Sequence, residues 1–318
     1  MDKLTCDFQN KYLAQQYFDP TVKGRIDSAV KVHGEADGNP LSSAASCLNV
    51  IGSLAINPKG LKTFLNSCGL AIDAILEFPT GASIGGRVYN DSGCAIFEWV
   101  GPRRSPINEA GGGRGQHRTS VDAFVLAKID GKTTQILIEW KFTEGLSRPL
   151  TLGRFCGGQG VERLHRYSTV LAKLRREYRK LKKSQDFPFL FSEEGYKESQ
   201  PETALGLYDL SPDHLYQLMR MTLLARTTTG MKLGEHVLED YRVVHLTHSQ
   251  NDMINILKPE YLLLSPGLKR AEGKPLHEVW SQILAPSERH RFVHGYWDKA
   301  IPSIEDSRLR SYLAERYG

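Results

Sequence analysis

The chain has 318 residues, of which 40% are hydrophobic and 24% charged, and its formal net charge is +5. These values are ordinary for a globular protein and exclude low-complexity chains. The mild positive charge permits a polyanionic partner without requiring one.

Cysteine usage and the distribution of apolar residues indicate the compartment. The five cysteines are widely spaced and form no CxxC pair, which excludes a zinc ribbon and a disulfide scaffold. The amino-terminal residues contain no apolar segment of the kind found in signal peptides, and no run reaches about 18 consecutive apolar residues. We therefore expect a cytoplasmic protein without a membrane partner.

The first hundred residues divide into a polar part and a part with regular patterns. Residues 1–40 are expected to be a helical extension, and residues 41–318 a single domain that ends in a helical part. Helices are predicted over 44–54 and 61–68, the first capped by Ser42 or Ser43. A hairpin is predicted over 87–100, turning near residues 90–93. Its second strand carries Glu98, which is either a site residue or a solvent-facing carboxylate at a sheet edge.

Residues 101–118 are rich in glycine and arginine. The GGGRG run lacks the spacing and the strand-to-helix context of a phosphate-binding Walker A loop. Arg114 and Arg118 make this segment a candidate arm for a nucleic-acid backbone, and an ordinary surface loop is the alternative.

A hairpin is predicted over 118–142, because Asp130-Gly131 between two apolar runs favours a type I′ turn. A two-residue turn makes paired residue numbers sum to 261, so Asp122 faces Glu139, and Lys141 points to the same side. Two facing carboxylates repel, and a divalent cation between them would offset that repulsion. A solvated hairpin is the alternative, but both strand faces are apolar, as in covered sheets. Val121 is expected on the face opposite Phe124.

The second half of the chain supplies helices and one further strand. A long helix from about 164 to 181 has one apolar stripe and a basic face, which either follows phosphates or is merely solvated. The candidate phosphate-binding residues of that face are Arg176, Arg179 and Lys180. A helix starting at 211–213 carries Tyr216 and Gln217, a strand covers 241–248, and the remainder is expected to be mostly helical. This order predicts an α/β fold with a mixed sheet covered on both faces.

Four segments in this order resemble the PD-(D/E)xK restriction-endonuclease-like nuclease superfamily. They are LSSAASCLN, RTSVDAF, IEWKFTE and LYQLMRMTLLA, and the third resembles the E-W-K-[YF]-T-E signature of one bacterial branch. The resemblance covers roughly residues 40–250. It implies an α/β/α core with a mixed central sheet and added helices. Val121 stands where the proline of the family name would be.

The resemblance also implies the roles of the site residues. Asp122 and Glu139 would hold Mg²⁺ (or Mn²⁺), and Lys141 would assist the attacking water. The core-helix glutamate of many relatives has no counterpart here, so Glu98 or Glu144 is expected to complete the ligand set. Tyr216 and Gln217 resemble the polar position beside the site. DNA is the expected partner, and a homodimer is an arrangement in which such enzymes cut both strands.

The leading hypothesis is a metal-dependent DNA endonuclease acting in restriction, phage defence or genome maintenance. The alternative is a catalytically idle restriction-like fold that serves as a nucleic-acid-binding or assembly module. A glycosidase pair of carboxylates is disfavoured by the adjacent Lys141 and by the lack of an aromatic cleft signature.

Overall fold

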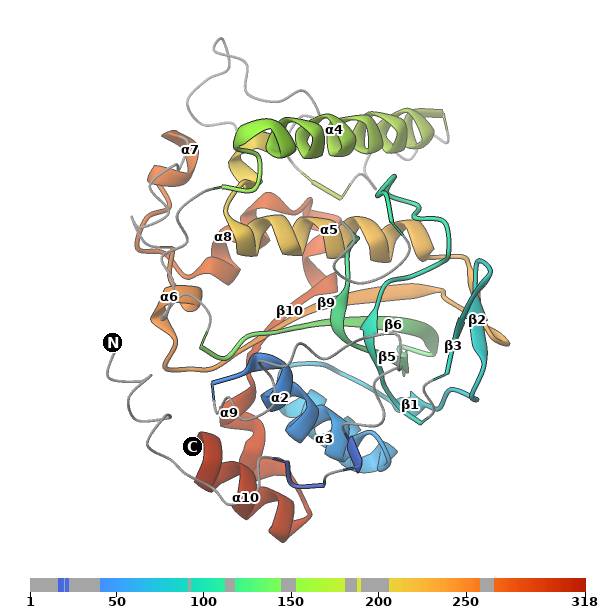
Figure 1. Ribbon diagram of the computed structural model, residues 1–318, viewed down its shortest axis with the longest axis vertical. Helices are drawn as coiled ribbons and strands as arrows, with labels where there is room; N and C mark the ends of the chain where they lie inside the picture. Colours follow the sequence, from blue (N-terminus) through green and yellow to red (C-terminus); the bar gives the residue numbers. More distant parts are fainter. Residues whose placement is uncertain are drawn as a thin grey trace.

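The computed structural model describes residues 17–19, 21–22, 41–90, 93–111, 118–143, 153–180, 188–189, 206–257 and 266–318. A mixed sheet lies at its centre (Figure 1). The strands of this sheet are β1 (Ala74–Leu76), β4 (Ile96–Trp99), β5 (Val121–Ile129), β6 (Lys132–Trp140), β9 (Asp240–Thr247) and β10 (Phe292–Tyr296).

The sheet combines antiparallel and parallel pairs. β5 and β6 form an antiparallel hairpin, and β1 and β4 pair with different parts of the other side of β5. β9 lies parallel to β6, and β10 lies parallel to β9. The predicted hairpin and the predicted strand in β9 are confirmed.

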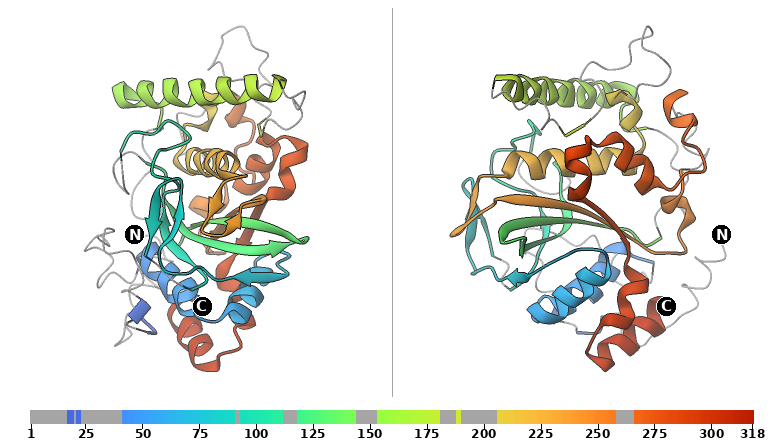
Figure 2. Two further views of the ribbon diagram at one scale, coloured as in Figure 1. Left: turned by 90° about the vertical axis from the view of Figure 1, so that its right-hand side faces the viewer. Right: turned by 180° about the vertical axis from the view of Figure 1, so that it is seen from behind.

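Helices cover both faces of the sheet (Figures 1 and 2). On one face α5 lies over the sheet and α4 lies over α5, while α2, α3 and α10 lie beneath the other face. The helices are α2 (Ser43–Cys47), α3 (Pro58–Ser67), α4 (Gly157–Lys180), α5 (Asp213–Thr228), α6 (Asp252–Asn255), α7 (Pro266–Lys269), α8 (Leu276–Ile283), α9 (Trp297–Ala300) and α10 (Ser307–Tyr317). The α/β class with a restriction-endonuclease-like core is thus confirmed.

Two hydrophobic cores result from the alternation of side chains along the strands. On β6, Leu137 packs towards α4 and α5, whereas Ile136 and Ile138 pack towards α2, α3 and α10. Gln135 fastens α5 to the sheet, because its Nε2 donates to the carbonyl oxygen of Ala225 at 2.8 Å and its Oε1 accepts from Thr228 Oγ1 at 2.9 Å. This attachment holds the carboxy-terminal end of α5 over the turn end of β6.

Two predicted elements differ from the structure. The hairpin expected over 87–100 is not formed: β3 (Arg87–Tyr89) pairs with β2 (Ala82–Ile84) across Gly85-Gly86, where both glycines have positive φ, and β4 pairs with β5 instead. β10 is a strand within the carboxy-terminal part that was expected to be mostly helical. Gly295 interrupts the apolar pattern of this strand. The position requires glycine, because a side chain there would overlap the carbonyl oxygen of Cys68.

The remaining elements include a π-helical turn after α2 and a second small hairpin. The helix predicted over 44–54 is α2 followed by a π-helical turn, Leu48–Gly52, and Ser42 caps it as expected. A second small hairpin joins β7 (Lys232–Leu233) and β8 (His236–Val237). Most of residues 1–40, including the proposed domain boundary, lie outside the described residues. Within the described part, no helix combines the length and the apolar composition needed to cross a bilayer.

Candidate active site

The candidate site lies at the open end of the β5–β6 hairpin, away from its turn. Asp130 and Gly131 have φ values of 50° and 73°, as a type I′ turn requires, and the ladder runs from that turn to the pair Ala123–Ile138. In a regular ladder the next hydrogen-bonded pair would join residues 121 and 140. Instead, the Trp140 amide donates to Asp122 Oδ2 at 2.7 Å. The Asp122 carboxylate thus takes the place of a backbone acceptor at the end of the hairpin.

β4 brings Glu98 to the same end of β5. Its pairing with β5 places Phe97 opposite Ala123 and Trp99 opposite Val121, so Glu98 takes the position across from Asp122. Glu98 has a φ of 52°, a left-handed conformation that costs a non-glycine residue about 1–3 kcal/mol. Its Oε2 accepts a hydrogen bond from Ser120 Oγ at 2.6 Å.

The altered backbone also corrects one expectation about the strand faces. Val121 was placed on the face opposite Phe124, but both side chains lie in the core beneath α5, together with Trp99. Strict alternation fails here because the β5–β6 ladder ends at Ala123 and the left-handed residue interrupts β4.

The buried thiol of Cys47 lies within electrostatic range of three carboxylates. Burial raises the pKa of the Cys47 thiol well above its usual value, and Asp122, Glu98 and Glu139 raise it further. Cys47 lies on α2, beneath the sheet, and is 3% exposed. It therefore stays a neutral thiol, and all three carboxylates influence it from the same end of the sheet.

Glu139 and Lys141 form a nearly dry ion pair on the α5 face of β6. Lys141 Nζ lies 2.6 Å from Glu139 Oε1, and the two side chains are only 9% and 6% exposed. Removing two charges from water is costly, and their mutual attraction must offset that cost. Trp140, which lies between these two residues in the sequence, donates to Asp122, so the Asp, Glu and Lys that the sequence singled out lie at the same end of the hairpin.

His245 is a neighbour of the site that the sequence reading missed. On β9 it is paired in register with Glu139, and it is 1% exposed. Burial lowers its pKa well below the usual value, and His294, His214, Lys141 and His277 lower it further, so the ring is neutral. Its Nδ1 has no hydrogen-bond partner among the described residues. The only signal in the sequence was a histidine within a β-branched strand.

The amino-terminal end of α5 contributes residues to the site. Asp213 accepts two hydrogen bonds from Arg154, at 2.6 and 2.7 Å. Burial works against its ionisation, but Arg154, then His214 and Lys141, hold the pKa of the Asp213 carboxyl below its usual value. Gln217 lies one turn further along α5, and its Oε1 is buried without a hydrogen-bond partner within the described part of the chain.

Tyr216 lies in a different environment from the one expected. It is 4% exposed, packs against Phe155 and Tyr167, and faces α4. Its hydroxyl is 3.4 Å from that of Tyr167, which in turn donates to Glu109 at 2.7 Å. The structure therefore assigns Tyr216 to the packing of α4 against α5, behind the carboxylates.

Glu109 is the centre of a buried polar network that the sequence did not reveal. Its carboxylate accepts hydrogen bonds from the amide and hydroxyl of Thr119, at 2.8 and 2.7 Å, and lies 2.9 Å from Arg220 Nη2. Thr119 immediately precedes Ser120, the partner of Glu98. This network therefore fixes the start of the strand that carries Asp122.

Segments distant in sequence hold the backbone around Lys141. Trp297 Nε1 donates to the carbonyl oxygen of Lys141 at 2.9 Å, and Asn251 Nδ2 donates to that of Phe142 at 2.7 Å. From the other side, Ser43 Oγ accepts from the Phe142 amide at 3.1 Å and Ser46 Oγ accepts from Trp140 Nε1 at 2.8 Å.

Replacing Trp297 with phenylalanine is expected to slow the nucleic-acid cleavage that the sequence predicts about 10- to 100-fold, because it removes the hydrogen bond to Lys141 but keeps a ring in the cluster. Trp280→Phe is the matched control: both indoles are 0% exposed, and Trp280 Nε1 has no hydrogen-bond partner among the described residues. Cleavage rates and melting temperatures of both variants would be compared. Equal losses of rate in the two would contradict a positioning role for Trp297.

The residues predicted to contact nucleic acid lie in different environments. Arg118 is 5% exposed, and its guanidinium donates to the carbonyl oxygens of Val100, Pro102, Arg103 and Gly111. It therefore stabilises the backbone of the 101–111 segment, and the prediction that it contacts a phosphate is wrong. Arg176 lies exposed on α4 and stays a candidate. Arg114, Glu144 and the side chains of Arg179 and Lys180 lie outside the described residues.

The donor set fits a hard divalent cation held mainly by carboxylates and water. Among the residues that the structure describes, no three His, Cys, Asp or Glu side chains are close enough to form a complete cage. Mg²⁺ does not need one, since it commonly uses one or two carboxylates and keeps several waters. Asp122 and Glu139 offer these oxygens, and the buried Gln217 Oε1 offers an acceptor to water.

Comparison with known proteins gives one match. A family model described as "Restriction Endonuclease associating with ARP" matches residues 3–318. No curated protein and no solved structure matches the sequence. The family match extends beyond residues 40–250, where the resemblance was recognised, and includes the carboxy-terminal segments that hold the Lys141 backbone.

Proposed function

Because the chain belongs to the family of restriction endonucleases associating with ARP, we propose that it is a metal-dependent DNA endonuclease of the PD-(D/E)xK type. The observation that carries this proposal is the ion pair between Lys141 and Glu139, at 2.6 Å, together with the Asp122 carboxylate, which accepts a hydrogen bond at 2.7 Å from the amide of Trp140 between them. The family supports a nuclease role and nucleic acid as the partner. The named residues and the cation are our own assignment.

The proposed chemistry divides between the cation and the protein. Mg²⁺ or Mn²⁺ held by Asp122 and Glu139 would neutralise charge on the phosphate and acidify a water molecule. Glu139 holds the Lys141 ammonium in place, and Lys141 Nζ orients the attacking water through a hydrogen bond. Glu98, across from Asp122, is assigned to the surroundings of the cation rather than to its direct ligands, because no three such side chains of the described residues are close enough to hold one ion. Its left-handed backbone is consistent with a position retained for function.

Burial around the site supports the same role. As whole residues, His245, Glu139 and Lys141 are 1%, 4% and 7% exposed, so little water surrounds the ion pair. In such surroundings an electrostatic interaction is stronger than in water. The neutral His245 adds no charge that would compete with Lys141 for the carboxylate.

Cation removal is the test of this function. The purified protein is expected to cut plasmid or linear duplex DNA in Mg²⁺ or Mn²⁺, to stop in excess EDTA, and to recover when the cation is restored, because the phosphate charge is otherwise unscreened. Single-stranded DNA and RNA would be assayed in parallel to define the substrate.

Calorimetric titration separates this function from the alternative, a binding or assembly module. A nuclease should take up Mg²⁺ or Mn²⁺ with a measurable heat that is lost in an Asp122→Asn variant, whereas a module without catalysis should not. Absence of both cation uptake and cleavage would overturn the proposal. A homodimer, a cytoplasmic location, a role in restriction, phage defence or genome maintenance, and a single domain over 41–318 remain predictions.

A further inference from the structure

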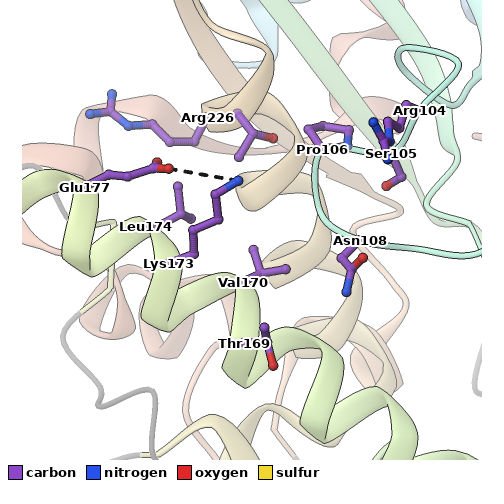
Figure 3. A pocket seen from close by; sticks show the side chains of 11 residues that line it. Arg104, Ser105, Pro106, Asn108, Thr169, Val170, Lys173, Leu174, Glu177 and Arg226 are labelled. Carbon is purple, nitrogen blue, oxygen red and sulfur yellow. Dashed lines mark ion pairs between the residues drawn. The ribbon is translucent and has the colours of Figure 1, made fainter.

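The polar groups around α5 are satisfied to different degrees at its two ends. At the carboxy-terminal end lies a cavity of about 750 Å³, bounded in part by α4 and the last turn of α5 (Figure 3). In its lining, Arg226 is ion-paired with the buried Glu288 at 3.9 Å. Lys173 is paired with Glu177 at 4.0 Å, the pair that Figure 3 marks with a dashed line. Beside the candidate active site, by contrast, the buried Nδ1 of His245 has no hydrogen-bond partner among the described residues.

His245 shares its position in the sheet with Glu139. The two residues are paired in the parallel ladder of β6 and β9, and the strand residues two positions before each belong to the core beneath α5. Both side chains therefore project from the α5 face, as does Lys141 two residues further along β6. Lys141 and His214, in the first turn of α5, both lie within electrostatic range of the His245 ring. His245 thus lies beside the ion pair of Glu139 and Lys141.

The Lys141 ammonium depends on acceptors supplied by the protein. Its side chain is 9% exposed, and its Nζ lies 2.6 Å from Glu139 Oε1. An ammonium has three N–H donors and no acceptor, so burying it without hydrogen-bond partners is costly. A cation bound to Glu139 would repel this ammonium and compete with it for the same carboxylate. A second, neutral acceptor close to Glu139 would then keep Lys141 in place.

The neutral imidazole of His245 can supply this acceptor. One of its two ring nitrogens carries a lone pair, and the positive potential of Lys141 favours the tautomer that turns this nitrogen towards the ammonium. The residue is 1% exposed, so bulk water does not compete for Nδ1. His294, the next histidine in the same row of the sheet, is instead engaged with Thr247 Oγ1 at 3.2 Å. A buried polar atom without a partner, next to a functional ion pair, calls for such an explanation.

We propose that His245 is a positioning residue for Lys141, whose ammonium donates to His245 Nδ1 whenever the Glu139 carboxylate is occupied by a cation or neutralised. In the ion-paired state, Lys141 contacts Glu139 and leaves Nδ1 without a partner. The charged acceptor on β6 and the neutral acceptor on β9 confine the ammonium to the space beside the proposed cation ligands. The importance of this contact for cleavage rests on the proposed nuclease function, whereas the contact itself does not.

The contact is tested without a cation, by ¹⁵N NMR of the histidine-labelled full chain in EDTA. In Glu139→Gln the Lys141 ammonium loses its carboxylate, and we expect the His245 Nδ1 resonance to move to that of a hydrogen-bonded acceptor. The shift should be absent from Glu139→Gln/Lys141→Met, in which no ammonium remains. A His245→Gln spectrum identifies the resonance. An Nδ1 resonance that is the same in the unaltered, single-variant and double-variant chains would overturn the proposal.

His277 provides the internal control for the spectra. Its Nδ1 is also buried without a partner among the described residues, but it belongs to α8 and stacks on His294 with ring centroids 4.2 Å apart. Its resonance should stay in place in both Glu139 variants. A shift of the same size at His277 and His245 would show a general rearrangement and would contradict a specific contact with Lys141.

Substitutions at position 245 test the role in cleavage. His245→Leu should lower kcat about 10- to 100-fold and change KM for DNA less than about threefold, because the lost interaction positions Lys141 and does not bind substrate. His245→Gln keeps a side-chain acceptor and should recover part of the rate. His277→Leu is the matched control and should cleave at the unaltered rate, with melting temperatures compared for all three.

The outcomes separate this role from the nuclease function. Equal rates of His245→Leu and His277→Leu, or equal losses in His245→Leu and His245→Gln, would rule out positioning by a hydrogen bond. If the unaltered chain binds no cation and cleaves no DNA, the nuclease function is wrong, and the cation-free spectra still decide whether Lys141 contacts His245.

Discussion

Replacing Glu139 with glutamine is expected to reduce cation-dependent DNA cleavage by about three orders of magnitude or more, as loss of a central catalytic group does in other hydrolases. The substitution keeps the shape of the side chain but removes the charge that holds Lys141 at 2.6 Å and that would bind the cation. The initial rate of plasmid cleavage in Mn²⁺ measures the effect, and circular dichroism verifies the fold.

Glu305→Gln provides the control for this variant. Glu305 also pairs with a lysine, Lys59, at 3.1 Å, but its side chain is 56% exposed and lies far along the chain from the hairpin. The control should cleave at the unaltered rate. If Glu139→Gln cleaves as fast as the control, the site has been assigned to the wrong residues, even if the protein proves to be a nuclease.

Replacing Glu109 with alanine is expected to lower the free energy of unfolding by about 3–5 kcal/mol, because Arg220 then keeps a buried charge without its partner. The Glu109 side chain is 1% exposed, and that of Arg220 is 17% exposed. Burial lowers the Arg220 pKa, but Tyr167, Glu109 and Tyr216 more than offset this, so the guanidinium remains charged. Urea denaturation followed by tryptophan fluorescence measures the loss.

A second substitution distinguishes the lost ion pair from general damage. Glu109→Ala/Arg220→Met removes both charges and should recover part of the lost stability. Glu177→Ala, in an exposed pair with Lys173, should cost less than about 1 kcal/mol. If the double variant is only as stable as Glu109→Ala, the lost hydrogen bonds from Thr119 and Tyr167, rather than the unpaired charge of Arg220, account for the effect.

The parts of the site that the sequence predicted depend on local geometry. Asp130-Gly131 favours one turn type, that turn fixes the register, and the register brings Asp122 and Glu139 to the same end of the hairpin, just beyond its last pair, Ala123–Ile138. Likewise, the apolar stripe of α4 and the β-branched run of β9 are properties of short windows. Each of these features was recognisable without knowing what else the chain contacts.

The missed features depend on contacts between distant residues. Glu109 lies in a glycine-rich segment, where nothing marks it as buried, and its partner Arg220 is 111 residues away. β4 pairs with β5 rather than β3 because Gly85-Gly86 makes a tighter turn earlier in the chain, a signal of the same kind as Asp130-Gly131 that was overlooked. The role of Trp297 follows from a hydrogen bond that spans 156 residues.

The contact between Trp297 and Lys141 has a consequence for synthesis of the protein. At about 5–20 residues per second, the ribosome adds Trp297 roughly 8–30 s after Lys141. During that interval the Lys141 carbonyl oxygen has no indole donor, although Asp122, Glu139 and Lys141 have all been made. A nascent or prematurely terminated chain therefore carries the site residues without their full support. If the proposed nuclease function is correct, this order of assembly delays full activity until the segment that contains Trp297 has been made and has folded.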